Sequence, residues 1–262
     1  MATLVSFHAH PDDESIATGG TLARAAAEGH RVVLVFATRG ECGEVPEGFL
    51  ADGEDLGERR AAETDASARV LGVHRVAFLG YRDSGMMGEP TNDDPACFWR
   101  ADPAEAADRL AALLTEEGAD VLTVYDDHGG YGHPDHIQVH RVGLRAAELA
   151  GVPVVAQSTF PREVLVARIM EMVPEGSEPP RIDTATFGKP AAEITHRVEA
   201  AAHAGAKRAS MRAHRSQMGD AHFMLAMPDD VFAASMGTEH YLVRDLPDEV
   251  PELFTELFTP TR

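Results

Sequence analysis

Two short segments of the chain combine imidazole and carboxylate side chains at close spacing. Residues 10–14 read HPDDE, and residues 131–136 read YGHPDH. Histidine and carboxylate ligands together suit zinc, and a catalytic zinc takes three protein ligands and leaves one position for water. Either segment alone could be an ordinary helix start, because Asp is a good N-cap and Pro suits the first helical turn. The chemistry therefore depends on whether the fold brings the two segments together.

The hydrophobic pattern predicts the strands and helices that would bring the two segments together. Short apolar runs alternate with amphipathic stretches, which is typical of buried strands alternating with helices. We expect strands at 4–7, 32–37, 76–79, 120–125 and 153–157, and helices at 14–28, 56–71, 103–117 and 134–150.

This alternation predicts an α/β fold, a Rossmann-like, doubly wound and mostly parallel sheet with strand order 3-2-1-4-5. The first segment then follows strand 1 and the second follows strand 4. These two strands are neighbours, and their carboxyl ends form the switch point at which such sheets bind ligands. The sequence therefore predicts a metal site at this edge of the sheet.

The rest of the chain continues without a change of composition that would mark a linker. We expect a single domain over 1–262, with 1–160 as the core and 161–262 as a C-terminal α+β extension that completes the pocket. In the extension, 194–198 and 239–243 have the character of strands and 201–216 that of a helix. Residues 161–192 show no pattern that assigns them a role.

Charge and composition exclude several classes of partner. The 262 residues include 43 Asp and Glu against 23 Lys and Arg, which gives a net charge of −20. Such a surface repels nucleic acids and anionic membranes, and the longest aliphatic run, 32–35, is too short to cross a bilayer. The two cysteines, Cys42 and Cys97, form no CxxC pair, which favours a reducing compartment, and we expect a cytoplasmic protein. The oligomeric state stays open, a homo-oligomer included.

Further motifs support a family resemblance. They are RAAE at 60–63, GYRDSGM at 80–86 and AHRSQ at 213–217. Together with the two metal-type segments, and in this order, they resemble the LmbE-like (PIG-L) family of zinc-dependent N-deacetylases. The loop at 82–86 is most similar to the branch that acts on N-acetylglucosaminyl-inositol in mycothiol synthesis.

The resemblance implies a metal centre and a base. His10, Asp13 and His136 would be the ligands of Zn²⁺, with Fe²⁺ as the alternative ion. Asp12 would be the general base that takes a proton from the attacking water. The residues alone offer two adjacent carboxylates, and only the resemblance says which of them binds metal.

The resemblance also implies roles for groups around that centre. His133, oriented by Asp135, would polarise the substrate carbonyl or protonate the leaving amine, and Tyr131 would help to hold the oxyanion. Arg60 and Asp83 would bind the hydroxyls of a small amino-sugar substrate, or would instead pair with each other to order their loops.

Several alternatives remain open at this stage. Within the family, the chain could be an amidase of mycothiol conjugates or a deacetylase of a natural-product glycoside, and outside it a ligand-binding module that keeps the fold. His8 and His140 are expected to pack or to support the metal ligands, His214 to pack, and Cys42 to be a loop thiol. Trp99 anchors its loop or stacks on a sugar.

Overall fold

A computed structural model describes residues 1–171, 173, 178, 184–219 and 222–261. Its centre is one eight-stranded sheet in the order β3-β2-β1-β4-β5-β7-β6-β8. The strands are β1 Thr3–His8, β2 Arg31–Phe36, β3 Arg75–Phe78, β4 Val121–Tyr125, β5 Val154–Thr159, β6 His196–Glu199, β7 Thr238–Val243 and β8 Thr259–Pro260. The first five strands pair in parallel, and β7, β6 and β8 continue the sheet in antiparallel fashion.

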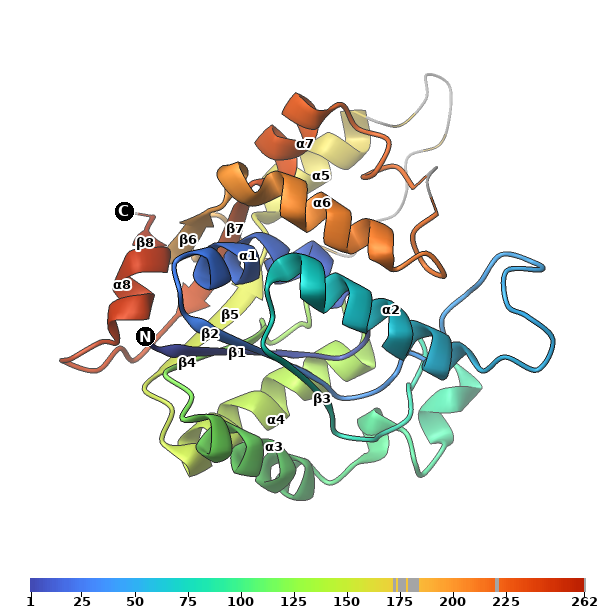
Figure 1. The fold of residues 1–262 in the computed structure, drawn as a ribbon, viewed down its shortest axis with the longest axis horizontal. Coiled ribbons are helices and arrows are strands. Elements are labelled where there is room, and N and C mark those ends of the chain that lie inside the picture. Colours follow the sequence, from blue (N-terminus) through green and yellow to red (C-terminus); the bar gives the residue numbers. More distant parts are fainter. Residues whose placement is uncertain (172, 174–177, 179–183, 220–221, 262) are drawn as a thin grey trace.

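Helices cover both faces of the sheet (Figure 1). Helices α3 and α4 lie on one face, and α1, α2 and α6 lie on the other. The helices are α1 Gly19–Ala27, α2 Leu56–Leu71, α3 Pro103–Glu117, α4 Pro134–Ala150, α5 Arg162–Glu171, α6 Ala204–Ala213, α7 Asp229–Met236 and α8 Glu252–Leu257. Because neighbouring strand residues point to opposite faces, Leu4 packs into the core under α1 and α2, whereas Val5 packs against α3 and α4.

The predicted fold class and the core strand order 3-2-1-4-5 are confirmed. The helices expected at 56–71, 103–117 and 134–150 have these bounds in the structure. Each ends at a glycine with a left-handed backbone, Gly72, Gly118 or Gly151, which is a conformation that glycine adopts without strain.

Other boundaries were wrong. The helix expected over 14–28 is divided, because residues 14–18 form a π-helical turn in which the Thr18 hydroxyl donates to the Glu14 carbonyl, and α1 begins only at Gly19. The helix expected over 201–216 ends at Ala213, where His214 leaves the helical conformation. The strand expected at 239–243 lies within β7, but α8 and β8 follow it, and neither these two elements nor α5 and α7 were predicted. Part of 161–192 lies outside the described residues.

A buried carboxylate joins the extension to the core. Glu239 of β7 accepts hydrogen bonds from the backbone amides of Gly20 and Thr21, both 2.8 Å long, and forms an ion pair with buried Lys207 of α6. An anion is stabilised at a helix N-terminus, where amide groups have no partner within the helix. In the described part of the chain, no helix combines the length and the apolar character needed to cross a bilayer.

This junction predicts opposite effects of two Gly→Ala substitutions. A Cβ at Gly20 would lie 2.6 Å from Ala200 Cβ and 3.0 Å from Glu239 Oε1, whereas a Cβ at exposed Gly205 of α6 would meet nothing within 4 Å. We expect Gly20→Ala to lower the free energy of unfolding by about 1–3 kcal/mol through overpacking. Gly205→Ala should raise it by up to about 1 kcal/mol through helix propensity. Urea denaturation measures both, and a tolerated Gly20→Ala would contradict the tight junction.

Candidate functional site

The two metal-type segments meet at the carboxyl ends of β1 and β4. These strands pair in parallel with Ser6 opposite Thr123, so that the chain leaves both strands at the same edge of the sheet. His10 follows β1, while His133 caps the N-terminus of α4 and His136 lies in its first turn. The ring centroid of His10 lies 4.6 Å from that of His133 and 5.4 Å from that of His136. The predicted convergence of the two segments is therefore present.

The contacts of His136 show which of its two ring nitrogens has a lone pair that could bind a metal ion. Nδ1 lies 3.1 Å from the carbonyl oxygen of Gly129, which can only accept, so Nδ1 carries the hydrogen. Nε2 is buried and has no hydrogen-bond partner among the described residues, and it lies 3.4 Å from Asp13 Oδ2. A buried nitrogen lone pair without a donor, beside a carboxylate, is what a metal ligand requires.

The Nδ1 atom of His10 faces the same carboxylate oxygen, Asp13 Oδ2. Its Nε2 faces Asp135 Oδ2 at 3.1 Å and Asp83 Oδ1 at 3.4 Å, so this nitrogen carries a hydrogen. Its Nδ1 lies 3.4 Å from Asp13 Oδ2. Although burial lowers the pKa of His10, the Asp83, Asp13 and Asp135 carboxylates raise it well above its usual value. The surrounding carboxylates thus favour a positive charge on His10, beside Asp13.

These spacings fit a divalent ion. Tetrahedral ligands at about 2.1 Å from zinc lie about 3.4 Å apart, and Asp13 Oδ2 is 3.4 Å from both His10 Nδ1 and His136 Nε2. At this site, the side-chain groups whose ligand atoms all lie within 4.8 Å of one another are His10 with His133 and His136, and His10 with Asp83 and Asp135.

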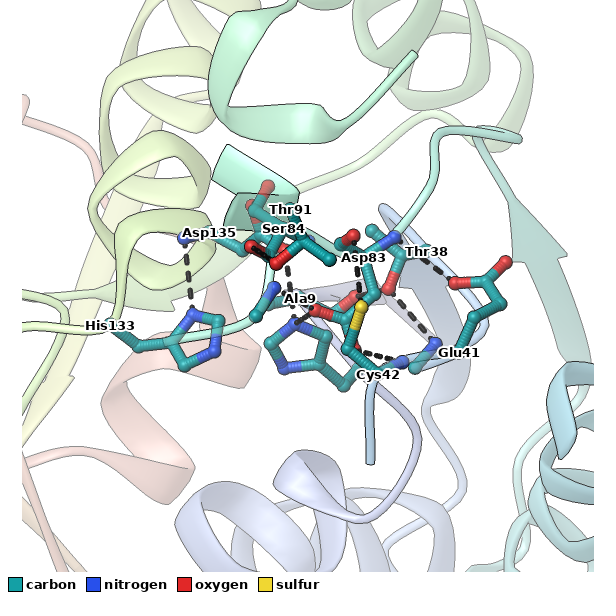
Figure 2. A network of polar contacts seen from close by, with 12 residues as sticks. Ala9, Thr38, Glu41, Cys42, Asp83, Ser84, Thr91, His133 and Asp135 are labelled. Atoms are coloured by element: carbon teal, nitrogen blue, oxygen red, sulfur yellow. Dashed lines mark hydrogen bonds and ion pairs between the residues drawn. The ribbon is translucent and has the colours of Figure 1, made fainter. Parts of the chain in front are cut away.

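The carboxylates of Asp83 and Asp135 already accept hydrogen bonds from other parts of the chain (Figure 2). Asp135 accepts from the amide of Ser84 at 3.0 Å and from the Ser84 hydroxyl, besides facing His10. Asp83, 7% exposed, accepts from the amides of Gly85 at 2.8 Å and Cys42 at 3.1 Å. Both carboxylates therefore orient His10 and join the loops around it, as carboxylates commonly do behind metal-binding histidines.

Two expectations from the sequence differ from this geometry. The Asp135 carboxylate contacts His10 instead of the His133 ring, and His133 is oriented by the Asp135 backbone amide, which donates to its Nδ1 over 3.2 Å. Arg60 and Asp83 do not pair with each other. Arg60 is buried, and it donates to the carbonyls of Pro11 at 2.5 Å and Gly40 at 2.7 Å.

Asp12 has an unusual backbone and a distinct environment. Its φ is 101°, a left-handed value that is costly for a residue with a Cβ. Glu14 Oε2 accepts from its amide at 2.9 Å, and Arg60 Nη2 lies 3.4 Å from its Oδ2. Burial raises the pKa of Asp12 to about 6, although Arg60 opposes this shift. Its side chain keeps 18% exposure, so that water can reach it.

A buried ion pair that supports Asp12 was not predicted from the sequence. Glu14 Oε1 lies 2.6 Å from His214 Nε2, and both side chains are fully buried. Burial raises the pKa of Glu14, but His214 and the Ser67 hydroxyl outweigh it and lower that pKa to about 2, while Glu14 raises the pKa of His214. Both residues lie within the motifs at 10–14 and 213–217, which was the available signal.

Two neutral donors border the candidate metal position. Burial and the neighbouring His10 and His136 lower the pKa of His133 to about 2, and since its Nδ1 accepts a hydrogen bond, its Nε2 carries a hydrogen. Tyr131 is 45% exposed, and its ring lies edge-on to those of His136 and His133. Removal from water and the Asp13 carboxylate raise the pKa of its hydroxyl, which therefore remains a donor.

Three further residues named from the sequence, His140, Trp99 and Cys42, make other contacts. His140 Nδ1 donates to the Tyr125 carbonyl at 3.0 Å, and Trp99 lies under the guanidinium of Arg141. Burial and Asp83 raise the pKa of the Cys42 thiol to about 11, which disfavours the reactive thiolate.

Two buried aromatic side chains, those of Tyr125 and His8, lie behind the candidate metal position. The Tyr125 ring stacks on that of His136, and its hydroxyl lies 3.0 Å from His8 Nδ1. Burial lowers the pKa of His8 to about 4, so this ring is neutral, and burial together with Asp13 raises the pKa of Tyr125 well above its usual value.

Comparisons with known proteins agree with the resemblance. The family model described as "PIG-L: GlcNAc-PI de-N-acetylase" matches residues 5–147. A protein of Thermomonospora curvata, named 1D-myo-inositol 2-acetamido-2-deoxy-alpha-D-glucopyranoside deacetylase, is 44% identical over 266 residues, which cover 92% of this chain and 89% of the relative.

Solved structures share the fold at low sequence identity. The N,N'-diacetylchitobiose deacetylase of Pyrococcus horikoshii superposes with a TM-score of 0.61 at 18% identity, covering 97% of this chain and 85% of that one. The 4-carboxy-2-hydroxymuconate hydratase GalB of Pseudomonas putida KT2440 also gives 0.61, at 17% identity over 96% of this chain and 99% of that one. Because a hydratase has the same fold, the fold alone does not define the reaction.

The buried Glu14–His214 pair predicts a large loss of stability when one partner is removed. We expect His214→Leu to lower the free energy of unfolding by about 3–5 kcal/mol, because Glu14 is left as an unpaired buried charge. The matched control is Glu105→Gln, which removes an exposed i,i+4 pair with Arg109 and should cost less than about 0.5 kcal/mol. Urea denaturation measures the free energy of unfolding of both variants. Similar small losses of stability in the two would show that the buried pair is dispensable.

Proposed function

Because the chain belongs to the PIG-L family of de-N-acetylases, we propose that it hydrolyses the acetamide of 1D-myo-inositol 2-acetamido-2-deoxy-α-D-glucopyranoside, releasing acetate and the free amine. This is the substrate in the name of the Thermomonospora curvata relative. The observation that carries the proposal is the convergence of two imidazole nitrogens and one carboxylate beside Asp12, His133 and Tyr131.

We assign the ion to His10 Nδ1, Asp13 and His136 Nε2. The donor set of two imidazoles and one carboxylate suits Zn²⁺, with Fe²⁺ as the alternative. When bound, such an ion polarises the amide carbonyl and lowers the pKa of a coordinated water. Asp83 and Asp135 hold the ring of His10 so that Nδ1 faces the ion.

Asp12 is the group that takes the proton from the attacking water. Its raised pKa of about 6 makes it a stronger base than an ordinary carboxylate, and it is still ionised at neutral pH. Arg60, which contacts both the Asp12 carboxylate and the Pro11 carbonyl, holds the base in place. These contacts support a positioning role for Arg60, whereas the resemblance implied a role in binding hydroxyls.

His133 and Tyr131 act on the carbonyl oxygen of the substrate. Both are neutral donors, and donors aimed at the developing oxyanion stabilise the transition state. As the C–N bond breaks, the proton that Asp12 took from the water passes to the departing nitrogen, and the neutral His133 keeps its Nε2–H as a hydrogen-bond donor to the carbonyl oxygen.

Recognition of the sugar falls to the loops at the strand ends. Asp83 ties the loop at 39–55 to the loop at 80–101 through the amide of Cys42, so it shapes the part of the site that would face the hydroxyls. We propose that these loops discriminate between glycosides.

Acetate release from a substrate panel tests the function. We expect the Zn²⁺-loaded protein to deacetylate N-acetylglucosaminyl-inositol far faster than free N-acetylglucosamine, and chelator treatment to abolish the activity. Asp12→Asn should keep its metal, measured by elemental analysis, and lose about 10²–10⁴-fold in kcat, the usual contribution of a general base. Cleavage of a mycothiol conjugate without acetate release would assign the chain to the amidase reaction instead.

The pH profile tests the base separately. A base acts only when it is deprotonated, so kcat/KM should fall as the pH drops below about 6, the pKa to which burial raises Asp12. Asn does not titrate at this position, so the residual activity of Asp12→Asn should not show this fall in kcat/KM at low pH. A wild-type profile that stays level between pH 5 and pH 8 would exclude Asp12 as the base.

A further inference from the structure

We propose that residues 186–189, which we call the strap, position the Tyr131 hydroxyl for the reaction by holding the peptide that leads into Tyr131. The inference rests on the proposed function, because it concerns the loop that carries this donor. Its positioning residues are Gly188 of the strap and Arg162 of α5, which anchors the strap. Both belong to the C-terminal extension and to none of the motifs found in the sequence.

The loop between β4 and α4 places Tyr131 between two glycines. Gly130 and Gly132 have left-handed φ values of 78° and 93°, and glycine adopts many other backbone conformations as readily. Asp126 Oδ1 accepts from the amide of Gly130, and the His128 carbonyl accepts from the amide of Gly132, both at 2.9 Å. These two bonds fix the peptide before Gly130 and the peptide after Tyr131. The peptide that joins Gly130 to Tyr131 takes its partner from outside the loop.

The strap supplies that partner. The Gly188 amide donates to the Gly130 carbonyl over 2.7 Å. This carbonyl belongs to the peptide that joins Gly130 to Tyr131, so the hydrogen bond restricts the rotation of that peptide. It thereby restricts the direction in which the side chain of Tyr131 leaves the backbone.

Two further contacts join the strap to the same loop. Thr186 lies against Gly132, because a Cβ built at Gly132 would be 3.7 Å from both Cβ and Oγ1 of Thr186. Lys189 is buried and forms an ion pair with the half-exposed carboxylate of Asp127. The strap therefore contacts the glycines on both sides of Tyr131.

The strap is itself anchored at the start of α5. Arg162 donates from Nε to the Phe187 carbonyl at 2.8 Å and from Nη2 to the Gly188 carbonyl at 3.0 Å. The Lys189 amide donates to the Phe160 carbonyl at 3.1 Å, and the rings of Phe160 and Phe187 pack edge-on with centroids 4.8 Å apart. A Cβ at Gly188 would lie 2.5 Å from Phe160 Cε2 and 2.7 Å from the Phe160 carbonyl oxygen. Any other residue at this position would therefore displace the strap from Phe160.

The metal ligand of this loop region is held separately. His136 Nδ1 donates to the Gly129 carbonyl, and the Gly129 amide donates to the Asp126 carbonyl at 2.9 Å. Asp126 Oδ2 in turn accepts from the Thr159 hydroxyl at 2.6 Å. Displacement of the strap should therefore move the Tyr131 hydroxyl and leave the metal-binding nitrogen of His136 in place.

The test compares two Gly→Ala variants of the Zn²⁺-loaded protein, with acetate release from N-acetylglucosaminyl-inositol as the assay. Gly188→Ala should lower kcat by about 10–100-fold at unchanged KM, because a misplaced donor no longer stabilises the oxyanion of the transition state. Its Zn²⁺ affinity, measured by competition with a chromogenic chelator, should stay at the wild-type value. The matched control is Gly151→Ala, since Gly151 has a similar left-handed φ of 69° and a Cβ there meets nothing within 4 Å. The control should keep the wild-type kcat.

A double-mutant cycle with Tyr131→Phe separates positioning from a general loss of structure. Without the hydroxyl there is no donor left to position, so Gly188→Ala should lower the kcat of Tyr131→Phe by less than about 2-fold. A strap that only supports the fold would lower kcat by the same factor in both backgrounds. That result would overturn the inference, as would a wild-type kcat in Gly188→Ala.

Variants of Arg162 decide the question if Gly188→Ala fails to fold. Arg162→Leu removes both donors to the strap and should reproduce the loss of kcat, whereas Arg162→Lys keeps one donor and should lose less. Hydrogen exchange, measured by mass spectrometry, should be faster at residues 128–133 in Arg162→Leu than in the wild type. Wild-type kcat and exchange in Arg162→Leu would overturn the inference while an active wild type upholds the proposed function. A Zn²⁺-loaded wild type that releases no acetate overturns the proposed function together with the inference.

Discussion

The parallel pairing of β1 with β4 is the constraint on which the site depends. It fixes where the chain leaves each strand, and hence the separation of His10 from His133 and His136. The two halves of the site lie more than a hundred residues apart in the sequence, and no local interaction could hold them together. Burial of the sheet under helices on both faces makes this register costly to change, because a one-residue slip would exchange the side chains that face the two cores. A rigid sheet thus provides the geometry that a metal centre needs.

Four aspartates occupy the site, and their surroundings give each a different property. Asp83 and Asp135 accept hydrogen bonds from backbone amides and orient the ring of His10. Asp13 lies between two imidazole rings. Asp12 has one guanidinium at 3.4 Å and partial access to water, and it is the member of this group whose pKa burial raises toward neutrality. The strained backbone of Asp12 is held by Glu14, whose charge is balanced by His214 from the C-terminal extension. The extension therefore contributes to the site by supporting Asp12, the base in our proposal.

Local signals and a topological rule made much of this predictable from the sequence. The three helices whose bounds were predicted have strong stop signals, and the strand order followed from the alternation of elements, which placed the two segments together. The short helices α5, α7 and α8 were missed because six to ten residues carry too little periodicity to be distinguished from loops. The partners of Arg60, Asp135 and His214 could not be predicted, because they depend on side-chain directions that only packing decides. His214 shows the difficulty: its motif was noted, yet its buried partner Glu14 lies 200 residues away.

X-ray diffraction at the zinc absorption edge, from crystals grown with Zn²⁺, would locate the ion relative to both nitrogens of His10 through its anomalous scattering. Those nitrogens face different carboxylates, because Nε2 faces Asp83 and Asp135, whereas Nδ1 faces Asp13. The account predicts one strong peak between His10 Nδ1, Asp13 and His136 Nε2. A peak between His10 Nε2, Asp83 and Asp135 would contradict it, because those two carboxylates would then be metal ligands and His136 would not.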